Sequence, residues 1–213
     1  MRDTFYNILI DPLPTTVEVA GRDISINADF RTAILFEQLM QSKEQDNVKG
    51  RIAFELFFPS ENLKAILSDA QATSDAIDAI VWFYSCSRQT RETVEQRTQN
   101  AVRRSNFGIQ RRIYDFDVDA PLIYAAFLAQ YGVDLQDVDF LHWWKFSAMF
   151  SALNDSNLIV KIMGWRSVDI ASIKNKTEKQ RLARLQAQYA LRDTKTIEEK
   201  QSLAGALFGG MMK

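Results

Sequence analysis

Few side chains in this sequence have the type and spacing that catalysis requires. The 213 residues include a single histidine, His142, and a single cysteine, Cys86. A Ser/His or Cys/His couple would have to use His142, and no nucleophile elbow or similar context supports one. No cysteine cluster surrounds His142, which argues against a transition-metal site. We therefore expect no catalytic residue, a hydrogen-bonded structural histidine, and a Cys86 that packs as a small buried apolar side chain.

Three aspartates alternate along the chain at Asp115, Asp117 and Asp119. Calcium loops also alternate carboxylates, but this run lacks the glycine at the sixth position and the glutamate at the twelfth. Capping and solvation explain these aspartates without an ion, since Asp119 precedes Ala120-Pro121 and proline fits the first helical turn. A phosphate loop and a dinucleotide fingerprint are also missing. We expect neither a metal nor a cofactor.

Arginines dominate residues 88–112, which hold seven of them against two glutamates, with few large apolar residues apart from Phe107. Guanidinium groups bind phosphates, so nucleic acid is one candidate ligand. Against it, the segment has few aromatics, no known nucleic-acid-binding motif follows, and the net charge is -1. We favour an exposed arm that pairs with nearby aspartates or with an acidic partner. Its candidate partner-binding residues are Arg103, Arg104, Arg111 and Arg112.

The densest apolar run covers residues 140–153 and includes His142, Trp143 and Trp144. It is apolar nearly all round, which predicts a central core helix covered on several sides. Its start would be capped by Asp134 or Asp137.

Alternating apolar residues at 17–19 and 24–26 predict a hairpin around residues 20–23. Helical spacing then predicts a series of helices, and several have a start or stop signal. The start signals are Asn27 or Asp29 for the first helix, Ser60 for the third and residues 73–75 for the fourth. The stop signals are Pro59 for the second helix and Gly132 for the fifth. The fourth should bury Ile77, Ile80, Val81 and Tyr84. The expected helices lie near residues 29–40, 48–58, 60–70, 73–84, 120–131, 158–165 and 177–191.

These elements predict a mainly α-helical single domain over residues 1–193 with a small N-terminal β-hairpin. Residues 194–213 lack a continuous helical face and predict a flexible tail. Its isolated apolar residues are further partner-binding candidates: Leu203, Leu207 and Phe208. No signal peptide or transmembrane run is present, which predicts a cytoplasmic protein without membrane contact.

Three stretches carry a resemblance to a known family: residues 114–123, 141–146 (Leu-His-Trp-Trp-Lys-Phe) and 161–170. The chain resembles the bacteriophage "gene product fifteen" family of Gram-positive tailed phages and prophages, from the hairpin to about residue 191. The genes of this family lie just before the tape-measure gene, which implies a tail assembly chaperone working in the host cytoplasm. The family has no established catalytic residues.

The sequence and the resemblance together predict a non-enzymatic tail assembly chaperone. It would bind the tape-measure protein and keep it soluble until the tail tube polymerises. The tail-tube protein, a second tail chaperone and a second copy of this chain stay open as further partners. The alternative is a small phage nucleic-acid-binding protein that acts through the arginine-rich arm.

Overall fold

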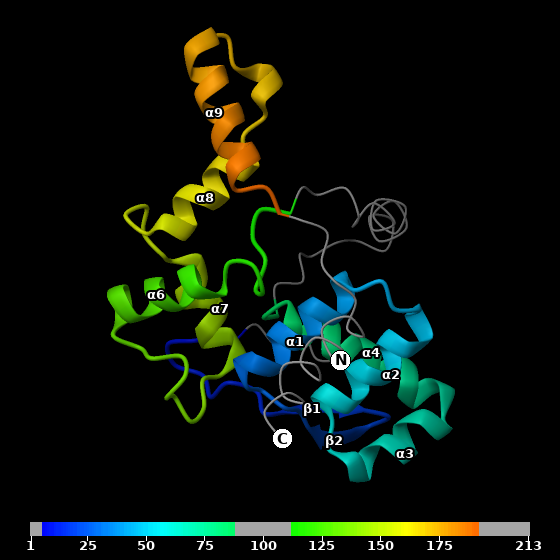
Figure 1. Cartoon of the computed structure of the whole chain (residues 1–213). Helices are drawn as coiled ribbons and strands as arrows, with labels where there is room; N and C mark the ends of the chain where they lie inside the picture. The colour runs from blue at the N-terminus through cyan, green and yellow to red at the C-terminus, as the bar shows by residue number, and fades with distance from the viewer. Residues whose placement is uncertain (1–5, 88–111, 192–213) are drawn as a thin grey trace, which may run out of the picture. The chain divides into compact units, whose positions relative to one another are not determined.

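The computed structural model describes residues 6–87 and 112–191, which form eight α-helices, a short 3₁₀ helix and a two-stranded hairpin (Figure 1). The predicted mainly helical class with an N-terminal hairpin is confirmed. The chain divides into two compact units. Among the described residues, unit 1 contains 6–87 and 140–147, and unit 2 contains 112–139 and 148–191. One cooperative domain over residues 1–193 stays a prediction.

The hairpin of unit 1 pairs β1 (Thr16–Val19) with β2 (Arg22–Ser25), in a register that places Val19 opposite Arg22. Its two-residue turn has positive φ at both Ala20 (49°) and Gly21 (71°). That geometry matches the right-handed twist of the strands. Alternation buries Val17 and Val19, and β1 packs against helix α4.

Four helices complete most of unit 1, and each packs against the next along the chain. Asp29 caps the first, accepting a hydrogen bond from the Arg31 amide at 2.9 Å, as predicted. Ser60 is the first residue of the third helix, after the cap residue Pro59, so the predicted Ser60 cap is wrong by one position. The four helices are α1 (Phe30–Gln41), α2 (Asp46–Phe57), α3 (Ser60–Ser68) and α4 (Ala70–Tyr84).

Helix α4 differs from its prediction in its start and in its buried face. Asp69 caps it by accepting from the Ala72 amide at 2.9 Å, so the cap at residues 73–75 is wrong. Ile77 and Val81, predicted to be inside, are 49% and 52% exposed. Because α4 is apolar around much of its circumference, periodicity alone does not select the buried side. The buried side of α4 is the one that carries its alanines. It consists of Ala72, Ala76, Ala79, Ile80 and Phe83.

Unit 2 is built on three longer helices. Helix α8 packs against both α6 and α9, and the 3₁₀ helix η1 packs against α9. Gly132, with φ 65°, ends α6 and donates its amide to the Leu128 carbonyl, as predicted. The elements are α6 (Ala120–Tyr131), α8 (Leu158–Ser167), η1 (Ile170–Ser172) and α9 (Lys176–Gln188).

Helix α7 (Trp143–Ser151) is shorter than the helix predicted over residues 140–153. Its start belongs to unit 1 and its end to unit 2. Asp134 does not cap it: the Asp134 carboxylate accepts from the Gln136 amide at 2.8 Å, within its own turn. A short carboxylate reaches the backbone two residues later more readily than a distant helix. Phe140, which precedes α7, is exposed, while Trp143, Trp144 and Phe146 are buried.

Candidate partner-binding site

His142 is a buried structural residue that joins two distant segments of unit 1. Its Nδ1 accepts a hydrogen bond from the Trp144 amide at 3.1 Å, and its Nε2 lies 3.0 Å from the Pro14 carbonyl oxygen. Since Nδ1 accepts, the proton sits on Nε2 and is donated to Pro14. Burial lowers the pKa of His142, Lys145 acts in the same direction, and the hydrogen bond to Pro14 opposes them. Neutral His142 is therefore the form that fits the fold.

The two tryptophans that follow His142 close the C-terminal end of α4. Trp143 donates its indole N–H to the Tyr84 carbonyl at 2.8 Å, and Trp144 donates its own to the Phe83 carbonyl at 2.7 Å. The last carbonyls of a helix lack partners within the helix, so these indoles add donors there, beside the Cys86 amide that also donates to the Phe83 carbonyl at 3.1 Å. The aromatic run is a packing and hydrogen-bonding device inside unit 1.

Residues 7–11 form a turn at the surface of unit 1, which we call the apolar turn. The Asn7 carbonyl accepts from the amides of Ile10 (3.1 Å) and Asp11 (2.8 Å). The Asn7 side chain accepts from the Leu9 amide at 3.0 Å, and the Asp11 carboxylate accepts from the Asn7 amide at 2.7 Å. Between these polar ends, Ile8, Leu9 and Ile10 are all exposed.

The apolar turn is fixed to the aromatic core on both sides. Tyr6, just before it, makes edge contacts with the rings of Trp82 and Trp144 at centroid distances of 5.8 and 5.3 Å. Pro14, just after it, is buried and accepts the hydrogen bond from His142. His142 and the tryptophan rings beside it therefore support a surface turn.

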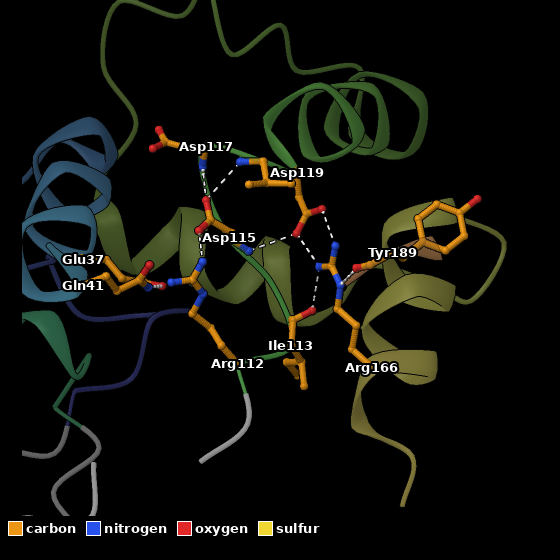
Figure 2. A network of polar contacts seen from close by, with 10 residues as sticks. Glu37, Gln41, Arg112, Ile113, Asp115, Asp117, Asp119, Arg166 and Tyr189 are labelled. Atoms are coloured by element: carbon orange, nitrogen blue, oxygen red, sulfur yellow. Dashed lines mark hydrogen bonds and ion pairs between the residues drawn. The ribbon is translucent and has the colours of Figure 1, made fainter. Parts of the chain in front are cut away.

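Unit 2 contains a buried ion pair that joins three segments. The Arg166 guanidinium binds the Asp119 carboxylate through both terminal nitrogens, at 2.6 and 3.0 Å (Figure 2). Arg166 also donates Nε to the Tyr189 carbonyl at 2.7 Å and Nη1 to the Ile113 carbonyl at 3.0 Å. Both charged side chains are almost completely buried. The expectation that Asp119 is solvated and acts only in local helix capping is wrong, because α8 brings an arginine to it.

Asp115 is the second buried carboxylate of this network, and solvation does not explain it either. It accepts from the amides of Asp117 (2.7 Å) and Val118 (3.0 Å), and from the guanidinium of Arg112. Its own amide donates to the Asp119 carboxylate at 3.0 Å. The alternating aspartates thus fold into a tight turn in which the carboxylates of Asp115 and Asp119 bind backbone amides and arginines (Figure 2).

Only one of the predicted partner-binding residues lies in the described chain. Arg112 is partly exposed and pairs with Asp115, which is the pairing with a nearby aspartate that the sequence favoured. Cys86, expected to be buried, is half-buried. The partner-binding candidates outside the described residues are Arg103, Arg104, Arg111, Leu203, Leu207 and Phe208.

Within 6–87 and 112–191, no three His, Cys, Asp or Glu side chains come close enough together to hold a metal ion. None of the helices in these ranges is long and apolar enough to cross a membrane.

Sequence reasoning assigned no function to the apolar turn and missed the Asp119–Arg166 pair. A signal for the turn was present, because Asn7 and Asp11 flank the apolar residues and Pro12 follows. The ion pair left no local signal, since its partners are 47 residues apart.

Comparison with known proteins places the chain in one family. No curated protein and no solved structure matches it. The family model described as Bacteriophage Gp15 protein matches residues 9–191, so the resemblance carried by the Trp-Trp-Lys-Phe run is confirmed. The match covers most of the 213 residues, and this chain therefore belongs to the Bacteriophage Gp15 protein family.

Proposed function

We propose that this bacteriophage protein is a non-enzymatic tail assembly chaperone. It binds the tape-measure protein in the host cytoplasm and keeps it soluble until the tail tube polymerises. A long helical protein with uncovered apolar stripes aggregates before its final partner encloses it. A chaperone prevents this by covering those stripes reversibly.

The observation that supports this proposal is the display of apolar side chains on ordered helices of unit 1. Ile77 and Val81 stand one turn apart on α4, and Leu35 and Met40 are exposed on α1. Isolated exposed apolar residues are normal, but a pair at i and i+4 forms a continuous strip along a helix. Such a strip is suited to the apolar face of another helix.

Co-expression with the tape-measure protein of the same phage tests the proposal. The full-length chain should increase the amount of soluble tape-measure protein. The double variant Ile77→Ser with Val81→Ser should reduce that gain while the protein stays folded, because both side chains are already exposed. A matched control is Ser74→Ala with Asp78→Ala, which changes exposed polar positions of the same helix. No gain in soluble tape-measure protein with the parent chain would reject the chaperone function.

Two further measurements address the regions outside the described residues. Deleting residues 194–213, with Leu203, Leu207 and Phe208, should leave the fold intact and lower the recovery of tape-measure protein. A gel shift tests the nucleic-acid alternative: tight, salt-sensitive binding to DNA at physiological salt would favour it over the chaperone.

A further inference from the structure

The apolar turn displays the two most exposed large apolar side chains among the described residues. Leu9 is 87% exposed and Ile10 is 78% exposed, and Ile8 beside them is exposed as well. Three consecutive aliphatic side chains in water are unfavourable unless a partner covers them. We infer that the apolar turn is an anchor that inserts into the apolar face of a partner helix. If the proposed function holds, that helix belongs to the tape-measure protein.

The turn is held rigid, which distinguishes it from a frayed chain end. Four hydrogen bonds within residues 7–11 fix its backbone. Tyr6 packs on two tryptophans on one side, and His142 holds Pro14 on the other. A rigid element loses little conformational freedom when it binds, so more of the apolar contact contributes to affinity.

The hydrogen bonds of the turn also indicate what kind of partner fits. The amides of Leu9, Ile10 and Asp11 already donate to Asn7. The turn therefore has no row of unpaired amides to which an extended strand could add. Its exposed aliphatic side chains are therefore the groups that it offers to a partner, and the holes between residues on an apolar helix face accept side chains of this kind.

A lipid surface is the competing partner, and the charges near the turn disfavour it. Residues 6–14 contain Asp11 and neither lysine nor arginine. Turns and helices that bind anionic membranes combine apolar residues with basic ones, because the lipid surface is negative. A carboxylate at the base of the anchor opposes that contact, so a protein surface is favoured.

Photo-crosslinking in the full-length chain tests the anchor directly. A photoreactive amino acid replaces Leu9 in one variant and Leu67 in the other, which is also exposed and lies on α3 of the same unit. After co-expression with the tape-measure protein, position 9 should crosslink to it, at the apolar face of a helix, and position 67 should not. Crosslinks from position 9 only to residues 192–213, only to a second copy, or to nothing would overturn the inference.

Charge insertion gives an independent measurement. Leu9→Asp should lower the affinity for the tape-measure protein by about tenfold or more, and Leu67→Asp by less than about threefold. Both should melt like the parent, since the changed side chains are exposed. Equal losses for the two variants would overturn the anchor, and so would flotation of the parent on anionic phosphatidylserine vesicles that Leu9→Asp abolishes. If the parent does not keep the tape-measure protein soluble but position 9 still crosslinks to it, the proposed function fails and the anchor stands. If position 9 makes no such crosslink, the anchor fails as well.

Discussion

His142 in unit 1 and Arg166 in unit 2 have similar structural roles and opposite electrostatics. Each is buried and joins segments far apart in the chain, His142 to Pro14 and Arg166 to Asp119 and the Tyr189 carbonyl. His142 does so as a neutral ring among aromatics, and Arg166 as half of an ion pair. The comparison teaches that the stability of unit 1 depends on His142 staying neutral. The stability of unit 2 depends on the presence of both Asp119 and Arg166.

The largest effect should come from breaking the ion pair of unit 2. Arg166→Met should lower the free energy of unfolding by about 3–5 kcal/mol, because Asp119 stays buried without its counter-charge. The carbonyls of Ile113 and Tyr189 also lose their donors. Chemical denaturation measures the change.

The matched control is the exposed pair formed by Arg181 and Glu178 on α9. Arg181→Met should lower the free energy of unfolding by less than about 1 kcal/mol, as surface pairs usually do. Similar losses of free energy of unfolding for Arg166→Met and Arg181→Met would show that burial does not determine how much an ion pair stabilises this fold. The double variant Asp119→Leu with Arg166→Met should be more stable than Arg166→Met alone, because it removes the unpaired charge.

A smaller effect should follow from removing one neutral hydrogen bond of unit 1. Trp144→Phe keeps an aromatic ring but removes the indole donor to the Phe83 carbonyl. The free energy of unfolding should fall by about 0.5–1.5 kcal/mol, the usual net contribution of one hydrogen bond, because the Phe83 carbonyl still accepts from the Cys86 amide at 3.1 Å. Trp165→Phe is the control, since its ring contact with Tyr189 survives the change. If Trp144→Phe were as stable as the parent, the closure of α4 by this indole would not matter.

The pH dependence of stability separates the two units further. The pKa of His142 is lowered in the fold, so below about pH 6.5 the unfolded chain binds a proton that the folded chain does not. The free energy of unfolding should then decrease as pH falls, by at most about 1.4 kcal/mol per pH unit for this one group. Denaturation between pH 5 and pH 7.5 measures the slope. His142→Gln should show a shallower slope, and an unchanged slope would assign the effect to other groups.

The smallest effect on stability should come from charge reversal in the arginine-rich segment. Reversing Arg103, Arg104 and Arg111 to glutamate should change the free energy of unfolding by less than about 0.5 kcal/mol, while weakening assembly in a salt-dependent way. Arg112 is left unchanged because it pairs with buried Asp115. Arg112→Glu is the contrast, since it places a like charge beside that carboxylate and should destabilise more. Thermal melts compare the two variants.

Local chemistry predicted much of the fold from the sequence. Alternation predicted the hairpin, although Arg22 and Asp23, which were predicted in the turn, belong to β2. Asp29 marked the start of α1, and Gly132 marked the end of α6. These features depend on hydrogen bonds and backbone angles within a few residues, so they can be recognised without knowing the rest of the chain. The helical class followed from the same local patterns, whereas the family followed from the resemblance carried by residues 114–123, 141–146 and 161–170.

Tertiary structure alone decided the buried side of α4, the partner of Asp119 and the support of the apolar turn. An apolar helix can bury more than one face, and the choice depends on its neighbours. The sequence predicted Asp119 only as a capping or solvated residue and assigned no role to Arg166, and their pairing became visible only when α6 and α8 packed together. His142 and Pro14 are 128 residues apart, and their hydrogen bond depends on how the chain returns to its N-terminal end, which no local pattern contains.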